Sequence, residues 1–179
     1  SGTLGRDVVA TIGARLLQAS LAVAVDGEVM DLMTPLRSSG AFVVITDKDP
    51  RALAVLRHSG AHILATAVRR LRPDAKIGFG PAIDDGFYYD FEVDKPFTPE
   101  DLAAFEAEMK KVVAEKYPFV RAEVSVDEAK KLFVDDPLKL ERLADFDGTD
   151  EIISTYTDGP FIDLCRGPHV PDTSHLKHF

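Results

Sequence analysis

A segment with helical periodicity constrains the fold of this chain more than any other feature. Apolar and small residues recur in it at spacings of three and four, which places them on one side of a helix. They are Leu53, Leu56, Gly60, Ile63, Ala67 and Leu71. His58 and His62 fall nearly opposite this stripe, because successive helical residues turn by roughly 100°. We therefore predict a helix that packs one side into the core and presents two imidazoles on the other.

The role of the histidine pair stays open from the residues alone. Two histidines at this spacing are common on a solvated helix face, where they have no function. A second pair with the same spacing, Cys165 and His169, follows near the end of the chain. The four side chains suit a tetrahedral zinc site, or a metal-free site in which imidazole accepts a proton from water. A buried structural thiol is the alternative for Cys165.

Composition narrows the class of protein. With 179 residues, 45% of them hydrophobic, the chain can form one ordinary domain and a small one. Its single cysteine cannot form an internal disulfide, and no apolar run approaches the roughly 20 residues of a membrane span. We therefore expect a cytoplasmic protein that makes no membrane contact.

The charge distribution bears on nucleic-acid binding. A net charge of -9 argues against a general nucleic-acid binder, whose binding surface is basic. Several basic residues nevertheless cluster on and just after the histidine helix: Arg57, Arg69, Arg70, Arg72 and Lys76. They indicate either a local positive patch or a solvated helix end whose charges suit the helix dipole.

The chain divides near residue 48 into a small module, residues 1–48, and a larger domain. The module has helical spacing from Val8 to Leu17, followed by two strand-like runs around Asp26-Gly27. This dipeptide is typical of tight hairpin turns, so we predict a β-hairpin there. A third strand is predicted over residues 41–46.

The larger domain, residues 49–179, alternates between helical and strand-like segments. Beyond the histidine helix, the predicted elements are a strand over 87–93, a helix from Thr98 to Pro118, a strand over 120–126, short helices after Ser125 and from Pro137, and a hairpin around Asp158-Gly159. Because helices and antiparallel hairpins are interspersed, we predict α+β architecture.

Three separated motifs are together far more specific than the histidine pair. They are Arg57–His62, Gly80–Asp90 and Asp163–Pro171. In this order they closely resemble the editing domain of bacterial threonyl-tRNA synthetases. Residues 1–48 resemble the ubiquitin-like β-grasp (TGS) module that precedes the editing domain in that family.

Two departures from the family pattern affect what we expect. The family's module normally opens with a further β-hairpin before the helix that starts near Asp7, so we expect an incomplete β-grasp sheet here. The aminoacylation domain is also missing. The resemblance therefore implies a piece of a longer synthetase, with the remaining synthetase domains as partners.

The resemblance implies post-transfer editing, which is the hydrolysis of serine wrongly attached to the 3′-terminal adenosine of tRNA(Thr). Serine lacks only the methyl group of threonine, and one methyl group distinguishes two substrates by roughly 1 to 3 kcal/mol. A second site that rejects threonine for its size is therefore needed. The expected partner is tRNA(Thr) carrying serine.

The resemblance also assigns catalytic residues. Four side chains are expected around the scissile ester: His58, His62, Cys165 and His169. Lys139 falls where the family has a lysine implicated in catalysis, although Leu138 stands where family members often carry tyrosine. We expect Lys139 and His58 to position the attacking water and to handle its proton.

Four further residues are expected to bind the substrate. The resemblance assigns Asp163 to the ammonium group of the amino acid and Gly80 to close approach of the terminal adenosine or serine. Tyr89 is expected to line that end of the pocket, and Arg166 to contact a tRNA phosphate. Each also has an ordinary structural explanation, such as a turn for Gly80 or a loop ion pair for Arg166.

The resemblance implies two answers about metal. The positions of His58, His62, Cys165 and His169 are similar to zinc ligands in editing domains of the alanyl type, whereas the threonyl type works through water and side chains. We expect no required cofactor and keep zinc as the alternative. Two other functions stay open: a non-catalytic tRNA-binding appendage with structural zinc, and a zinc-dependent editing hydrolase of the alanyl type.

Overall fold

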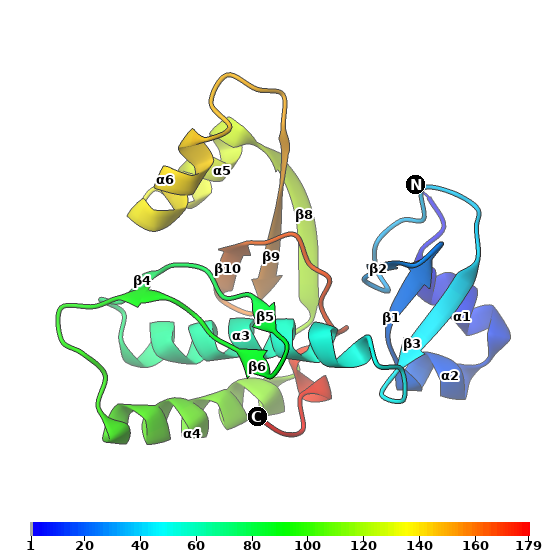
Figure 1. The fold of residues 1–179 in the computed structure, drawn as a ribbon, viewed down its shortest axis with the longest axis horizontal. Helices are drawn as coiled ribbons and strands as arrows, with labels where there is room; N and C mark the ends of the chain where they lie inside the picture. Colours follow the sequence, from blue (N-terminus) through cyan, green and yellow to red (C-terminus); the bar gives the residue numbers. More distant parts are fainter. Residues whose placement is uncertain (1) are drawn as a thin grey trace.

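The computed structural model describes residues 2–179. Its central element is helix α3 (Ala52–Leu71), which lies between helix α4 (Pro99–Glu115) and an antiparallel sheet (Figure 1). The sheet contains β8 (Phe119–Ser125), β9 (Ile152–Asp158) and β10 (Phe161–Leu164) in the order β10-β9-β8. This mixed arrangement of helices and antiparallel sheets agrees with the predicted α+β class.

One apolar core joins these three layers. Ile63 and Ala67 of α3 pack in the same cluster as Val112 of α4 and as Phe119 and Tyr156 of the sheet. These five side chains are at most 6% exposed. Because α3 contributes to both contacts, it is the element on which the rest of the domain is built.

Local sequence signals set the beginnings of the other helices as predicted. A capping box of Thr98 and Asp101 starts α4, with each side chain accepting a hydrogen bond from the backbone of the other. A second capping box starts α5 (Val126–Leu132) at Ser125, and a proline is the first residue of α6 (Pro137–Ala144). No helix within residues 2–179 is both long and apolar enough to cross a membrane.

Burial along α3 differs from the predicted pattern. Between Ser59 and Val68 nearly every residue is buried, because the helix has neighbours on several sides. Leu53 and Leu71, predicted as core residues, are 50% and 41% exposed, since they lie near the ends of the helix. His62 is only 1% exposed, which excludes the alternative that it is a solvated surface histidine.

The N-terminal module contains a small sheet and two short helices. Strands β1 (Ser20–Val25), β2 (Glu28–Met30) and β3 (Phe42–Thr46) pair antiparallel in the order β2-β1-β3. The predicted single helix is divided into α1 (Gly5–Ile12) and α2 (Ala14–Ala19).

Strand β1 connects the module to the domain. The hairpin turn before β2 is formed, as predicted, by Asp26 and Gly27, with φ of 49° and 89°. Every residue of β1 is buried: Val23 packs with Val9 of α1, whereas Ala22 belongs to the core around α3. The module lies beyond the N-terminal end of α3 (Figure 1). Its β-grasp assignment stays a prediction.

Short strands and loops connect α3 to α4. Strand β4 (Lys76–Ile77) pairs with β7 (Phe91–Glu92), and β5 (Ala82–Ile83) pairs with β6 (Gly86–Phe87). The predicted continuous strand over 87–93 is therefore interrupted, although Tyr89 is buried between exposed neighbours as the alternation predicted. A short 3₁₀ helix, η1, spans Thr173–His175 near the C-terminal end and packs on α4.

Candidate functional site

The two predicted pairs of ligating side chains meet at the middle of α3. His58 and His62 come from α3, and Cys165 and His169 come from the loop that follows β10. One nitrogen or sulfur atom from each residue lies within 4.8 Å of those of the other three. Cys165 Sγ is 3.3 Å from Nε2 of His58 and 3.3 Å from Nε2 of His169. The sheet brings this about, because β9 and β10 deliver the loop onto α3.

Burial keeps the histidines of this cluster neutral. It lowers the pKa of His62 to about 4, lowers that of His58, and holds that of His169 well below its usual range. His58 is the half-buried member of the three, whereas His62 and His169 are each 1% exposed. At pH 7 each ring therefore has a nitrogen lone pair that can accept a proton or a hydrogen bond.

The thiol of the cluster is also neutral. Burial raises the pKa of Cys165 to about 12, although the backbone N–H of Gly167 donates a hydrogen bond to Sγ over 3.2 Å. A thiolate, not a thiol, is the nucleophile in cysteine chemistry. The arrangement therefore suits Cys165 as a hydrogen-bonding neighbour of the histidines rather than as the group that attacks a substrate.

Asp163 is held by a buried network beside the cluster. Lys139 Nζ lies 2.5 Å from Asp163 Oδ1 and also donates to the carbonyl oxygen of Gly78 over 2.5 Å. The hydroxyl of Tyr89 donates to the other carboxylate oxygen, which is 3.5 Å from Nε2 of His62. Burial raises the pKa of Tyr89 well above its usual range, so its hydroxyl stays a donor. The network fixes the carboxylate against His62.

A pocket of about 430 Å³ opens over the cluster. His58, His62, Asp163 and Cys165 form one part of its wall. Other lining residues include Phe79, Gly80, Pro81, Arg142, Phe146, Arg166 and residues 151–154. Lys139, Tyr89 and His169 do not line it, so these three act on the pocket through the residues that they touch.

Gly80 and Tyr89 are linked in a way that the sequence did not show. A Cβ built on Gly80 would lie 2.2 Å from Cδ2 of Tyr89. Glycine is therefore needed at this position for the tyrosine ring to reach Asp163, independently of any ligand. Arg166 is exposed and lies at the pocket wall, where it can meet an anionic group from solvent.

Two acidic residues at the site were not predicted. Asp158 Oδ1 is 3.9 Å from Nδ1 of His62, and among the described residues neither atom has a hydrogen-bond partner. Its other oxygen accepts a hydrogen bond from the Thr66 hydroxyl over 2.7 Å, and burial raises the pKa of Asp158 well above its usual range. Asp31 of the N-terminal module accepts a hydrogen bond from the backbone N–H of His169 over 2.6 Å. In the sequence both are acids beside turns, which gives no signal of either contact.

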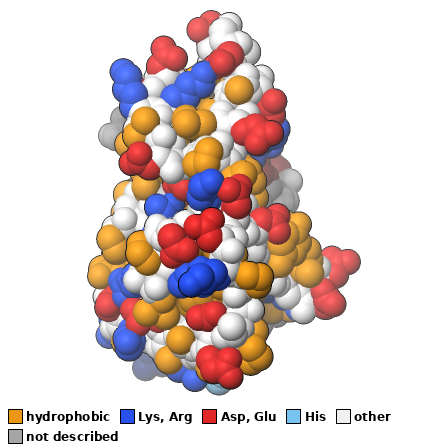
Figure 2. Space-filling model, turned by 90° about the vertical axis from the view of Figure 1, so that its left-hand side faces the viewer, with side chains coloured by type: hydrophobic (Ala, Val, Ile, Leu, Met, Phe, Trp, Pro, Cys, Tyr) orange, Lys and Arg blue, Asp and Glu red, His pale blue; other side chains and the backbone are white. Residues whose placement is uncertain are grey.

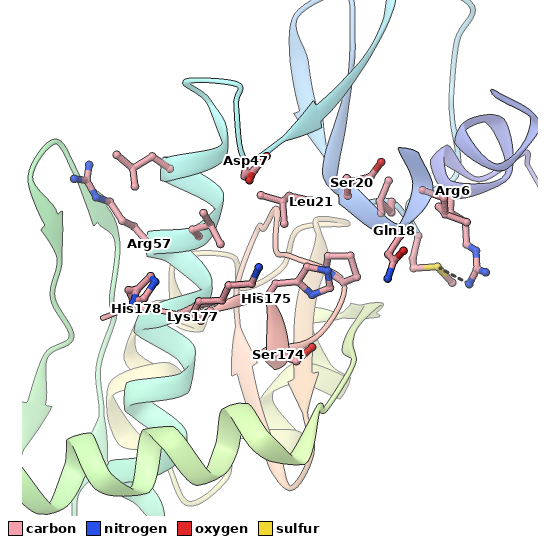
Figure 3. Close-up of a pocket in the computed structure, with 18 of the residues that line it drawn as sticks. Arg6, Gln18, Ser20, Leu21, Asp47, Arg57, Ser174, His175, Lys177 and His178 are labelled. Atoms are coloured by element: carbon pink, nitrogen blue, oxygen red, sulfur yellow. Dashed lines mark hydrogen bonds between the residues drawn. The ribbon is translucent and has the colours of Figure 1, made fainter. Parts of the chain in front are cut away.

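A larger pocket lies between the N-terminal module and the domain (Figure 3). It has a volume of about 1030 Å³. Arg57 of α3 and Lys177 of the C-terminal segment lie on one side, and Arg6 of α1 on the other (Figure 3). None of the predicted catalytic or substrate-binding residues lines this pocket. The candidate active site is therefore the smaller pocket over the histidines.

Among the described residues, acidic side chains pair with four of the five basic residues that could form a positive patch, whereas Arg57 donates to the backbone carbonyl oxygens of Ile83 and Asp84. Arg70 pairs with Glu108 and Glu115 of α4, and Arg69 pairs with Asp136. Arg72 and Lys76 are likewise paired, with Asp74 and Glu92. Figure 2 views this end of the molecule and shows basic and acidic side chains interspersed.

Comparison with known proteins identifies the relatives of this chain. Residues 153–179 match the model described as the threonyl and alanyl tRNA synthetase second additional domain, and this segment includes Cys165 and His169. Threonine–tRNA ligases from Bacillus velezensis and Enterococcus faecalis are 47% identical over 99% and 100% of the chain, and that from Pelobacter propionicus is 46% identical over 100%. The chain is homologous to part of the bacterial threonine–tRNA ligases. It spans 28% of the length of each of these three relatives.

The homology includes both parts of the chain. Because two of the alignments cover all of it, residues 1–48 have counterparts in the threonine–tRNA ligases as well. The alignments therefore include the module as well as the segments that carry the four ligating side chains. This is consistent with the direct contact between Asp31 and the loop that carries His169.

Proposed function

We propose that this chain is an editing unit that hydrolyses seryl-tRNA(Thr) to serine and tRNA(Thr). The observation that carries the proposal is the pocket of about 430 Å³, in which neutral imidazoles, a neutral thiol and a fixed carboxylate meet. These are groups that can bind an amino acid and activate water. Homology to threonine–tRNA ligases supports the choice of tRNA(Thr) as the carrier.

Asp163 is assigned to the ammonium group of the serine. Its carboxylate lines the pocket and is held in place by Lys139 and Tyr89. A carboxylate fixed in a water-poor site binds a cation more strongly than one in solvent, because the local dielectric constant is low. Since Lys139 contacts Asp163 and does not line the pocket, its contribution is to hold the carboxylate in place.

His58 is assigned to the proton of the attacking water. It lines the pocket and is half-buried, and its lowered pKa leaves the ring neutral at pH 7. In the proposed reaction the water oxygen bonds to the ester carbonyl carbon while His58 takes a proton from the water. The bond to the ribose oxygen then breaks, and this oxygen receives the proton as the 3′-terminal adenosine leaves.

The four-residue cluster also fits zinc, which is the second candidate. In tetrahedral zinc sites the bond lengths put nitrogen and sulfur ligands roughly 3.5 Å apart, close to the 3.3 Å separations of Cys165 from His58 and from His169. Four such ligands, with His62 as the fourth, would form a closed structural site. A catalytic zinc would be held by three of these residues, and its open position would let it act as a Lewis acid on the ester. Zinc binding would release the proton of Cys165. We favour the metal-free site because the resemblance is to the threonyl type of editing domain, which works through water and side chains.

Serine release from seryl-tRNA(Thr) by the purified chain tests the proposal. Threonyl-tRNA(Thr) serves as the control substrate, and a parallel sample contains a chelator. We expect rapid loss of serine only, unaffected by the chelator and abolished in His58→Ala. His178→Ala, which removes an exposed histidine outside the site, is the matched control.

Each other result has a definite meaning. Loss of activity with the chelator, restored by zinc, would replace the metal-free mechanism by the zinc mechanism. Equal hydrolysis of the serine and threonine esters would contradict an editing role. Binding of tRNA without release of serine would favour a non-catalytic appendage.

A further inference from the structure

We propose that Asp31 of the N-terminal module is a positioning residue for the editing site, which is therefore incomplete without the module. The inference rests on the proposed function for its effect on hydrolysis. Its structural part, that Asp31 holds the loop carrying His169, depends only on the contacts described here and can be tested separately.

Both carboxylate oxygens of Asp31 face the domain. Oδ1 accepts a hydrogen bond from the backbone N–H of His169 over 2.6 Å, and Oδ2 accepts one from the hydroxyl of Tyr156 over 2.5 Å. Thr34, in the module itself, donates a third to Oδ2 over 3.0 Å. Asp31 is 8% exposed, so the carboxylate is almost completely removed from water.

These hydrogen bonds fix the loop at His169, whose ring lies in the histidine and cysteine cluster. The ring of His169 lies with Nε2 3.3 Å from Cys165 Sγ, and Ser59 is 3.1 Å from its Nδ1. The ring also packs edge-on against Tyr156, with centroids 4.6 Å apart. Asp31 therefore holds both the backbone of His169 and the tyrosine against which its ring rests.

Tyr156 limits the loop from a second direction. A Cβ built on Gly167 would lie 2.1 Å from the hydroxyl oxygen of Tyr156, so the loop backbone passes directly over this group. Asp31 orients that hydroxyl by accepting its proton in a hydrogen bond. A displacement of Asp31 would consequently shift the loop backbone both at Gly167 and at His169.

Burying a carboxylate between two protein surfaces has an unfavourable desolvation free energy. Removing the charge from water is unfavourable unless hydrogen bonds compensate it, and apolar packing would join the surfaces without that cost. At Asp31 two of the three compensating donors come from the segment that presents His169 and from strand β9, which contains Tyr156. The carboxylate thus gives a defined direction to the loop, which apolar contacts do not.

Two substitutions separate positioning from charge. In Asp31→Asn the side-chain oxygen can still accept from His169, and the amide can donate to the oxygen of Tyr156, so the geometry survives without the charge. Asp31→Ala removes both bonds. Glu28→Ala, at an exposed carboxylate of the same module, is the matched control.

The full chain is used for two measurements. Amide hydrogen exchange at His169 reports the loop directly, and the kcat and KM for serine release report the proposed reaction. For Asp31→Ala we expect exchange at His169 to be about tenfold faster. We also expect kcat to fall by about tenfold or more with KM nearly unchanged, because misplaced groups lose rate rather than affinity. Asp31→Asn and Glu28→Ala should retain both properties.

Unchanged exchange and kcat in Asp31→Ala would overturn the inference, and so would an equal loss in Asp31→Asn, which would point to charge. If the unmodified chain releases no serine, the proposed function fails, whereas exchange at His169 still decides whether Asp31 holds the loop. If Asp31→Ala does not fold, Tyr156→Phe provides the same test with a smaller change. It removes one bond and should raise exchange at His169; unchanged exchange would again contradict the inference.

Discussion

Helix α3 carries two groups of ionisable side chains that behave in opposite ways. In its middle, His58 and His62 are held neutral because burial lowers their pKa values. At its C-terminal end, Arg69 and Arg70 pair with Asp136, Glu108 and Glu115, and the side chains in these pairs are 11% to 38% exposed. The hydrogen bond from Arg70 lowers the pKa of Glu115, which favours the charged form of this carboxylate.

The difference between the two regions follows from solvent. Desolvation penalises charge, so a buried group becomes neutral or takes a buried partner, whereas a surface group keeps its charge and gains little from pairing. Strongly perturbed groups gathered in a pocket are characteristic of functional sites. Substitutions in the middle of α3 and at its end should therefore have very different effects.

The largest effect is expected where a buried pair loses one partner. In Lys139→Met, Asp163 is left buried without its cation, and breaking such a pair typically destabilises by about 3 to 5 kcal/mol. Urea unfolding of the purified chain measures the change. Serine release should be lost as well, because the carboxylate is no longer fixed.

The double variant Lys139→Met with Asp163→Asn is the control for this prediction. It removes the unpaired charge, so much of the lost stability should return while activity does not. A loss below about 1 kcal/mol in Lys139→Met would place this pair with the surface pairs and remove the contrast between the two regions.

The next effect concerns Asp158 and depends on pH. Burial raises its pKa well above the usual value, so the folded chain keeps a proton that the unfolded chain releases above about pH 3.8. Stability is therefore lost as pH rises, by up to about 1.4 kcal/mol per pH unit. Asp158→Asn removes this penalty, and its advantage over the unmodified chain should grow as the pH of urea unfolding is raised above the usual pKa of an aspartate.

Glu115→Gln is the matched control, with the opposite sign. Arg70 lowers the pKa of Glu115, so this carboxylate stabilises the chain above its usual pKa and the benefit disappears as pH falls. The variant should lose stability at neutral pH and approach the unmodified chain in acid. Parallel pH profiles for Asp158→Asn and Glu115→Gln would mean that the two carboxylates experience similar surroundings.

Two glycines allow a crowded position to be compared with an open one, with no change in charge. Gly80→Ala would place a methyl group 2.2 Å from the ring of Tyr89, whereas a Cβ at Gly86 meets nothing within 4 Å. We expect Gly80→Ala to destabilise by about 1 to 3 kcal/mol and to slow serine release, because Tyr89 must move away from Asp163. Thermal unfolding and single-turnover hydrolysis measure both effects, and equal results for the two variants would contradict this contact.

The elements that were predicted correctly rest on signals within a few residues. The turn at Asp26-Gly27 and the capping box at Thr98 need only their immediate neighbours. The pairs His58/His62 and Cys165/His169 could be found in the sequence because the members of each are only four positions apart. The structure was needed to show that the two pairs lie together. Their common site was expected from the resemblance to a family, which already contains the long-range information.

The contacts that were missed join residues far apart in sequence. Asp31 accepts from a backbone N–H 138 positions away, and Asp158 from Thr66, 92 positions away. In the same way the sequence left open whether the basic residues form a positive patch, because Arg70 meets Glu108 and Glu115 of a helix 38 and 45 positions further on. Periodicity and turn chemistry describe single elements, and they do not state which elements will pack together.

The smallest effect is expected for Arg70, in spite of its two partners. Arg70 lies 3.1 Å from Glu108 and 2.6 Å from Glu115, and its side chain is 22% exposed. Partly exposed pairs of this kind contribute roughly 1 kcal/mol or less, and salt screens them. Arg70→Gln should therefore lower the free energy of unfolding by about that amount in low salt and by less in 0.5 M salt.

The rate of serine release is a second measurement that separates the two regions of α3, because Arg70 does not line the pocket over the histidines. Serine release by Arg70→Gln should match that of the unmodified chain. In Lys139→Met, by contrast, the charge that is removed is buried beside the pocket, and serine release should be lost. A loss of several kcal/mol in Arg70→Gln that persists in 0.5 M salt would show that this end of α3 is shielded from solvent as its middle is. The separation of α3 into a buried neutral region and an exposed charged one would then have to be abandoned.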